Sequence, residues 1–292
     1  MTDSASISTT DLTIPASDGF ELAATLFEPA QDNGRVVLIN AAMAVKRGYY
    51  RKYAAFLAEH GFTAITYDYR GIGGSRPAHR ASLRGFTAYL WEWGAQDLDG
   101  LIAWIEAGYP SRKLLVVSHS VGGQIVGLTA RNSRIAGMLG VAVQSAYWKL
   151  WPGLWRWRMF ILWYVLFPVL TPLIGYIPGK LGVGEDLPAG VALDWARGGR
   201  HPHYMLDLYR GTGYDHFAAF TAPFVDYSFS DDTYAPYETV KSLLTFYPNA
   251  AKTHKHLQPS DVGAESVGHF GFFRDKFATT LWAESAVWLE SV

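Results

Sequence analysis

Short apolar runs alternate with stretches of helical periodicity along most of the chain. The run Val-Val-Leu-Ile within residues 35–40 is continuously apolar, which is typical of a strand buried on both faces of a parallel sheet. The repeated strand–helix–strand order predicts an α/β fold with a doubly wound, mostly parallel sheet and right-handed crossovers. The predicted strands are 6–15, 20–28, 35–40, 62–67, 113–118, 135–143, 223–229 and 251–257, and the predicted helices are 49–59, 86–106, 121–129, 237–246 and 273–289.

The alternation stops between residues 146 and 212, where the sequence is rich in Trp, Pro and Gly and has helical patches but no clean strand. It resumes at residue 223 and continues to the last predicted helix. A single α/β domain interrupted by an insertion explains this order. We therefore predict a core of residues 1–145 and 213–292 and an inserted helical cap of residues 146–212.

The most apolar part of the insertion is residues 159–178, which carry no charge. This length would suit a transmembrane helix, but the segment contains Pro168, Pro172, Gly175 and Pro178. Proline removes a backbone donor and breaks interior helix bonds, and unsatisfied backbone groups are costly in lipid. We expect a pair of short helices that are buried or face a cleft, and a membrane-associated enzyme is the less favoured alternative.

The overall composition narrows the classes of function. The chain has 292 residues, of which 49% are hydrophobic and 17% charged, with a net charge of −1. This excludes a disordered chain, and scattered basic residues argue against a nucleic-acid partner. The absence of Cys excludes disulfides, thiolate metal sites and a Cys nucleophile. The N-terminal residues 1–5 show no secretory pattern, so a cytoplasmic protein is expected, with its oligomeric state left open.

The clearest chemical motif is Ser118-His119-Ser120-Val121-Gly122-Gly123, which follows an apolar strand and opens a predicted helix. A nucleophile held on a sharp strand-to-helix turn needs small residues two positions away on either side. Ser118 and Gly122 meet this need around Ser120. A helix N-terminus also directs backbone donors and partial positive charge at a developing oxyanion. We interpret His119 as a structural residue beneath the turn.

Two further residues complete a nucleophile–base–acid set in the order expected along the chain. Asp232 follows the predicted strand 223–229, and His269 precedes the last predicted helix. An acid at this position would hold the imidazole in the orientation that a general base needs. Asp231 is the alternative acid, although Asp232 has the more suitable spacing to Pro236.

These residues resemble the α/β-hydrolase superfamily over nearly the whole chain. Asp68-Tyr69-Arg70-Gly71-Ile72-Gly73-Gly74-Ser75 is similar to the family's D-x-R-G-x-G-x-S turn, and Asp232-Thr233-Tyr234-Ala235-Pro236 is similar to its D-x-x-x-P acid loop. Within the superfamily the chain looks like bacterial predicted serine hydrolases of the lysophospholipase and monoglyceride-lipase type.

The sequence departs from the family pattern after the third strand. Asn40-Ala41 stands where the family often has His-Gly. By that register, the resemblance implies an oxyanion hole made by the amides of Val121 and Ala42, with Met43 as the alternative to Ala42. A backbone donor needs no particular side chain, so the departure weakens the motif more than the mechanism.

The resemblance implies a serine hydrolase that cleaves a carboxylic ester or thioester through an acyl-enzyme. A Ser-dependent acyltransferase or a cofactor-free perhydrolase would use the same residues, and a non-catalytic binding protein on this fold is the alternative of another class. Six of the 11 Trp lie between Trp148 and Trp195, which favours an apolar small-molecule substrate. The candidate substrate-binding residues are Met43, Trp148, Trp151 and Trp155.

No metal or cofactor is expected. His201 and His203 form one pair, and His254 and His256 form another, but neither pair has a convincing third ligand in the sequence. The glycines at positions 71, 73 and 74 are not followed by the G-K-[ST] of a phosphate-binding loop, so we interpret them as a tight turn.

Overall fold

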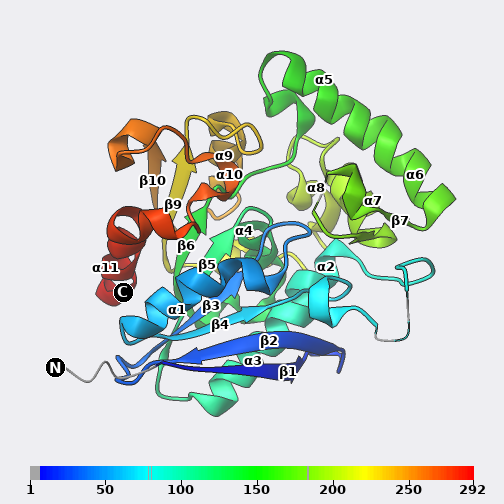
Figure 1. Cartoon of the computed structure of the whole chain (residues 1–292). Coiled ribbons are helices and arrows are strands. Elements are labelled where there is room, and N and C mark those ends of the chain that lie inside the picture. Colours follow the sequence, from blue (N-terminus) through cyan, green and yellow to red (C-terminus); the bar gives the residue numbers. More distant parts are fainter. Residues whose placement is uncertain (1–6, 78, 80, 183) are drawn as a thin grey trace.

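The computed structural model describes residues 7–77, 79, 81–182 and 184–292. Its centre is an eight-stranded sheet with the order β1-β2-β4-β3-β5-β6-β9-β10 (Figure 1). β2 pairs antiparallel with β1 on one side and with β4 on the other, and the remaining pairs are parallel. The strands are β1 (Ser8–Pro15), β2 (Glu21–Glu28), β3 (Arg35–Asn40), β4 (Thr63–Tyr67), β5 (Lys113–His119), β6 (Ile135–Val141), β9 (Pro223–Phe229) and β10 (Ala251–Leu257).

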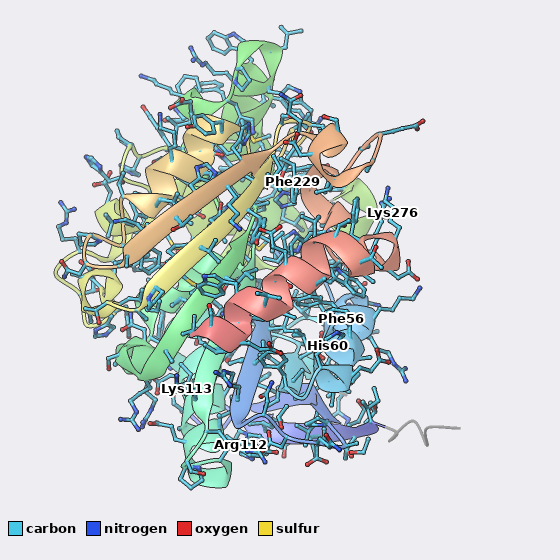
Figure 2. All side chains as sticks on the ribbon, turned by 90° about the vertical axis from the view of Figure 1, so that its left-hand side faces the viewer. Phe56, His60, Arg112, Lys113, Phe229 and Lys276 are labelled. Atoms are coloured by element: carbon cyan, nitrogen blue, oxygen red, sulfur yellow. The ribbon has the colours of Figure 1, made fainter. Side chains whose placement is uncertain are left out.

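Helices cover both faces of this sheet. α1 (Arg51–Glu59) and α11 (Ala283–Ser291) lie on one face, where Phe56 packs against Trp282 with ring centroids 5.3 Å apart (Figure 2). α9 (Tyr237–Leu244) lies on the other face. This distribution is the one that right-handed crossovers produce, so the predicted doubly wound α/β fold is confirmed.

Two predicted helices have different lengths in the structure. The predicted helix 86–106 begins at Leu90 and runs through α2 (Leu90–Glu92), a π-helical segment (Trp93–Leu98) and α3 (Asp99–Gly108). The helix after β5 is short. It consists of α4 (Gly122–Ile125) followed by a 3-10 turn (Val126–Leu128).

The insertion, residues 146–212, holds one long helix where two short ones were predicted, so that prediction is wrong. α5 (Gly153–Ile161), a π-helical segment (Leu162–Leu166) and α6 (Phe167–Ile174) follow each other without a break. Pro168 lies in the first turn of α6, directly after the π-helical segment. A local π turn changes the hydrogen-bond pattern, so the missing donor of a proline at this point does not end the helix.

The rest of the insertion consists of short helices and strands. It contains α7 (Ala189–Gly198) and α8 (Met205–Tyr209). It also contains β7 (Tyr176–Ile177) and β8 (Leu187–Pro188), which form a small antiparallel pair that the sequence analysis did not predict. Two-residue strands are too short for any periodicity to indicate them. Figure 1 shows the insertion beyond the carboxyl ends of β5, β6 and β9.

Residues 153–174 form a helix that is long and apolar enough to cross a membrane by length and composition alone, yet only 22% of its most apolar 18-residue window is buried. The buried side chains recur every four residues and form one stripe along the helix. They are Met159, Trp163, Phe167 and Thr171. The helix is therefore seated on the protein by one face, while most of its apolar surface is outside.

Candidate active site

Ser120 occupies a strained turn between β5 and α4. Its φ angle is 54°, in the left-handed region that is rare for residues other than glycine. A Cβ at Gly122 would lie 2.7 Å from the Asn40 carbonyl oxygen, and one at Gly123 would overlap Val143. Both positions therefore need glycine for the helix to approach the sheet, as a nucleophile turn requires.

Asp232 and His269 meet at the carboxyl ends of the strands. The His269 Nδ1 atom lies 2.7 Å from Asp232 Oδ2, and both side chains are almost completely buried. The other carboxylate oxygen of Asp232 accepts hydrogen bonds from the amides of Tyr234 and Ala235. The carboxylate is thus fixed by its own loop and directed at the imidazole.

Asp231 has a different task. Its carboxylate accepts hydrogen bonds from the Ser266 hydroxyl and from the amides of Val267 and Gly268. Partial burial alone would raise the pKa of Asp231, but these hydrogen bonds outweigh it and hold the pKa below its ordinary value. Asp231 therefore anchors the loop that carries His269, and its side chain does not contact the imidazole through any hydrogen bond described.

The Ser120 hydroxyl hydrogen-bonds the side chain of Gln144, with distances of 3.3 Å to Oε1 and 3.2 Å to Nε2. Among the described side chains it makes no such bond to His269. Gln144 lies just after β6 and is itself buried. The sequence analysis missed this residue, and the one signal for it was its position beyond the carboxyl end of a parallel strand.

Gln144 also connects the nucleophile to the insertion. Its backbone oxygen accepts a hydrogen bond from Gln124 Nε2 at 2.5 Å. The Gln124 Oε1 atom in turn accepts from the hydroxyl of Tyr204 at 2.9 Å. Tyr204 belongs to the insertion, is fully buried and has a φ angle of 49°. A continuous polar path therefore runs from Ser120 to a strained residue of the insertion.

The last residue of β3 and the loop after it are held by three tyrosine hydroxyls. Tyr67 donates to Asn40 Oδ1 at 2.9 Å, and Tyr69 donates to the Ala41 carbonyl at 2.8 Å. The Ala42 amide donates to the hydroxyl of Tyr50 at 2.8 Å.

This last bond bears on the expected oxyanion hole, for which the sequence analysis gave the Ala42 amide with that of Met43 as the alternative. A donor already bonded to a buried hydroxyl is not free to bind a developing oxyanion. The neighbouring Met43, the alternative in the sequence analysis, becomes the better candidate. A one-residue difference in register separates the two, and sequence alone did not resolve it.

His119 lies beneath the nucleophile and connects two loops of the site. Its Nδ1 is 2.8 Å from the Tyr50 hydroxyl, and its Nε2 is 2.9 Å from the backbone oxygen of His269. A carbonyl only accepts, so Nε2 must carry the proton and Nδ1 must accept from Tyr50. Burial, with a smaller contribution from His269, lowers the pKa of His119 well below its ordinary value. His119 is therefore a neutral, structural histidine.

Of the four predicted substrate-binding residues, three lie near the site. Trp151 is buried, and its indole donates to the Thr233 carbonyl in the acid loop. Trp155 lines a pocket of about 210 Å³ together with Asp232. Met43 is buried in the loop after β3. Trp148 instead contacts rings of the helix in the insertion, which are those of Trp157, Phe160 and Tyr164.

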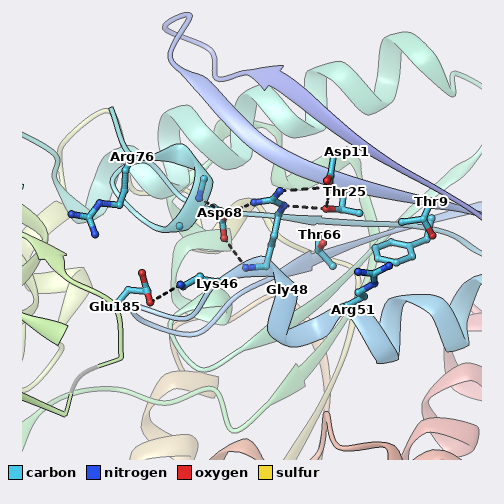
Figure 3. A pocket seen from close by; sticks show the side chains of 14 residues that line it. Thr9, Asp11, Thr25, Lys46, Gly48, Arg51, Thr66, Asp68, Arg76 and Glu185 are labelled. Carbon is cyan, nitrogen blue, oxygen red and sulfur yellow. Dashed lines mark hydrogen bonds and ion pairs between the residues drawn. The ribbon is translucent and has the colours of Figure 1, made fainter. Parts of the chain in front are cut away.

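A larger and more polar pocket, of about 770 Å³, opens beside β1 and β2 (Figure 3). None of the three predicted catalytic residues lines it. Within it, Asp68 accepts hydrogen bonds from the Arg47 amide and side chain, and Lys46 pairs with Glu185 at 3.0 Å. Asp68 also accepts from the Gly74 amide, which closes the predicted turn after β4.

The histidine pairs do not gather metal ligands in the part of the chain described. His254 and His256 both contact the hydroxyl of Ser228, at 2.7 and 2.8 Å. Among the described residues, no group of three or more His, Cys, Asp or Glu side chains is arranged to hold a metal ion.

Comparison with known proteins places this fold and site in a class. The family described as "Serine aminopeptidase, S33" matches residues 31–176, which is half of the chain. Solved structures are similar over almost their whole length, although their sequences are distant. A search of curated proteins found no match.

Three of these structures illustrate the similarity. An esterase from Pyrococcus furiosus has a TM-score of 0.61 at 14% identity, covering 98% of this chain and 91% of its own. An alpha/beta hydrolase from Penicillium has a TM-score of 0.61 at 18% identity, covering 97% and 98%. An esterase from Exiguobacterium antarcticum has a TM-score of 0.62 at 16% identity, covering 97% and 100%.

The fold and the family match together define an α/β hydrolase, an enzyme of the serine hydrolase type. More narrowly, the chain belongs to the family of the S33 serine aminopeptidases.

Proposed function

We propose that this protein is a carboxylic ester or thioester hydrolase that uses Ser120 as nucleophile, His269 as general base and Asp232 as the orienting acid. The observation that carries the proposal is the 2.7 Å contact between His269 and Asp232, together with a serine held at a positive φ angle between β5 and α4. These features supply a fixed acid–base pair and the sharp strand-to-helix turn of a nucleophile.

The reaction begins when the Ser120 hydroxyl leaves Gln144 and turns to Nε2 of His269. His269 takes the proton while Oγ attacks the carbonyl carbon, and Asp232 stabilises the imidazolium that forms. The protonated His269 then gives its proton to the leaving alcohol or thiol. Water, deprotonated by the same imidazole, hydrolyses the acyl-enzyme and restores the serine.

The amides of Val121 and Met43 are assigned to the tetrahedral oxyanion. Val121 follows the nucleophile at the start of α4, where helix donors are unpaired. Each donor of this kind is worth roughly 3 kcal/mol of transition-state stabilisation. The Tyr50 hydroxyl, bonded to the Ala42 amide, fixes the loop that presents Met43.

The substrate is expected to carry an apolar acyl chain. The small pocket beside Asp232 is bounded by Pro152, Trp155 and Phe229, and Trp151 closes against the acid loop. The pocket is also lined by the polar residues Ser230, Thr233 and His256, so the expectation of an apolar ligand rests on the aromatic side chains beside them. Ser120 is only 4% exposed, so the insertion, acting as a cap, must shift to admit the substrate.

A fluorophosphonate probe tests the nucleophile. We expect labelling of the intact protein and none of Ser120→Ala. Ser118→Ala is the matched control, because this neighbouring serine accepts a hydrogen bond from Asn40 and has no assigned role in the chemistry. Labelling that persists in Ser120→Ala would refute the assignment.

p-Nitrophenyl esters of increasing chain length test the substrate class. We expect kcat/KM to rise from acetate to medium-length chains, and activity confined to acetate would contradict an apolar acyl site. An amino-acid p-nitroanilide should be cleaved far more slowly if the ester proposal is correct. Adding an alcohol acceptor measures whether the acyl group passes to water or to the alcohol, which separates a hydrolase from an acyltransferase.

A further inference from the structure

The long helix of the insertion leaves a continuous apolar face uncovered. Its buried stripe faces the protein, and the opposite side carries large apolar residues that are between 38% and 86% exposed. These residues are Leu154, Trp157, Ile161, Tyr164, Val165, Leu166, Val169 and Leu173. Scattered apolar residues on a surface are ordinary, but a contiguous patch of this kind marks an interaction site. We refer to these eight residues as the exposed helix face.

The charged residues in the chain segment that carries this face all have one sign. Between Glu106 and Glu185 the sequence contains no acidic residue. The charged residues of the insertion up to that point are Lys149, Arg156, Arg158 and Lys180, all positive. Arg158 lies with its guanidinium 4.5 Å from the centre of the Trp155 ring, at the start of the helix. The exposed helix face is therefore apolar along its length and basic at its ends.

We propose that the exposed helix face docks on the surface of an anionic phospholipid bilayer, with the helix lying in the plane of the interface. A helix with an apolar face, exposed Trp and flanking basic residues has the features of an interfacial helix. Trp157 and Tyr164 suit the headgroup boundary, where their amphipathic rings are favoured. Nearby basic residues add attraction to anionic headgroups.

The helix lies on the bilayer and does not cross it. Its buried stripe is tied to the insertion, since the Trp163 indole donates to the Ala146 carbonyl at 3.1 Å and the Arg200 guanidinium donates to the Trp163 carbonyl. A crossing helix would have to give up these bonds and its packing. Docking by the outer face leaves all of them in place.

A bilayer also fits this face better than a second copy of the chain. Two copies meeting through the same patch would bring the basic ends of both helices into one interface. No carboxylate in the segment between Glu106 and Glu185 is present to compensate them. An anionic membrane supplies the missing negative charge. This proposal differs from the expectation drawn from the sequence, and it stands independently of the catalytic proposal.

Vesicle co-sedimentation tests the docking, with vesicles of pure phosphatidylcholine and of phosphatidylcholine containing one part in three of phosphatidylglycerol. We expect the intact protein to bind the anionic vesicles and to be released by high salt. Trp157→Glu combined with Ile161→Glu should weaken binding at least roughly tenfold, because it places charge in the apolar face. Arg156→Gln and Arg158→Gln should each weaken it by about fivefold.

The matched control is Val287→Glu, which changes an equally exposed apolar residue on α11, far from the insertion in the sequence. Its vesicle binding should equal that of the intact protein. Hydrolysis of a soluble short-chain ester and circular dichroism report whether each variant is folded. If the double Glu variant does not fold, the two Arg variants test the docking in its place. The proposal is overturned if the folded protein ignores anionic vesicles, or if the face variants bind as well as the control. It is also overturned if sedimentation equilibrium shows a dimer that the face variants dissociate.

Discussion

Two regions of this molecule are rich in aromatic residues, which are buried in one region and exposed in the other. Beneath the predicted nucleophile, Tyr50, Tyr67 and Tyr69 are fully buried, and each hydroxyl is bonded to the last residue of β3 or to the loop after it. On the long helix of the insertion, Trp157 and Tyr164 are 56% and 40% exposed. The first group fixes the chain at the end of β3, and the second forms an exposed apolar surface.

The difference matters because composition does not distinguish the two regions. A buried tyrosine is tolerated when its hydroxyl is satisfied, and the bond then fixes its partner in place. A contiguous patch of partly exposed aromatic and aliphatic residues leaves apolar surface in water and indicates a partner. Substitutions in the two regions should therefore affect different measurements, which are catalysis and stability in the first region and vesicle binding in the second.

The largest effect on kcat is expected at Asp232, the acid proposed to orient His269. Asp232→Asn keeps the shape but loses the charge that orients His269, and kcat should fall by about 10⁴-fold. Asp231→Asn is the control, since it weakens only the anchoring of the loop, and its kcat should fall by roughly tenfold or less. Steady-state kinetics on one p-nitrophenyl ester measures both. A larger loss of kcat in Asp231→Asn than in Asp232→Asn would show that Asp231 is the acid and that the assignment to Asp232 is wrong.

The next effect is expected at Tyr50, whose hydroxyl bonds both the Ala42 amide and His119. Tyr50→Phe leaves two buried polar groups unpaired, at about 1–3 kcal/mol each in the free energy of unfolding. It should also lower kcat, because the loop bearing Met43 loosens. Tyr53→Phe is the control. Among the described residues its hydroxyl is hydrogen-bonded to Ser285 alone, so stability should fall with kcat unchanged. Urea denaturation measures the stability of both variants, and ester kinetics measures their kcat. Equal losses of kcat in Tyr50→Phe and Tyr53→Phe would contradict the role of Tyr50 in positioning the loop.

A smaller effect concerns acid stability. His119 stays neutral when folded because burial lowers its pKa, whereas the unfolded chain takes up a proton near pH 6.5. The free energy of unfolding should therefore fall as pH drops below about 6.5, by at most about 1.4 kcal/mol per pH unit from this group. Burial, aided by His256, also lowers the pKa of His254 to about 4, with the same sign.

Urea denaturation over a pH series measures this slope. The slope should be shallower in His119→Gln, which cannot be protonated. If this variant and the intact protein lose stability in parallel from pH 7 to pH 5, His119 is not neutral in the folded state as inferred.

The smallest effect on folding should come from the exposed helix face. Trp157 is about half exposed and packs against Trp148, so Trp157→Gln should lower the free energy of unfolding by about 1 kcal/mol. A much larger loss would mean that this face is covered by the protein itself. Thermal unfolding of Trp157→Gln beside Trp163→Gln, whose indole is buried and bonded, gives the sharpest contrast.

The sequence was sufficient to predict features that depend on local chain geometry. The alternation of strand-like and helical segments predicted β9 and β10 with their observed bounds. The residues proposed as nucleophile, acid and base each follow a rule about strand ends and turns, and the structure brings Asp232 and His269 into contact. These positions follow from where a parallel sheet presents its carboxyl ends.

Other features depend on contacts between distant residues, and the sequence did not reveal them. Gln144 bonds a hydroxyl 24 residues earlier, and Tyr50 meets His119 across 69 residues. The register that favours Met43 over Ala42 is decided by where the Tyr50 hydroxyl falls. The unbroken helix from 153 to 174 depends on a π turn that no periodicity indicates. In each case a tertiary contact or an irregular turn decides the outcome, and no local propensity encodes it.

The place where the insertion leaves the sheet has a consequence for how this enzyme can change. The chain departs after Val141 and returns at Pro223 to pair with the strand it left. The entropy of closing such a loop grows only logarithmically, by about 0.6 kcal/mol for each doubling of its length. Evolution can therefore lengthen, shorten or rewrite the excursion at almost no cost to the sheet. Changes in this segment can alter the substrate that is bound or the place in the cell where the protein acts, while the nucleophile and its partners stay unaltered.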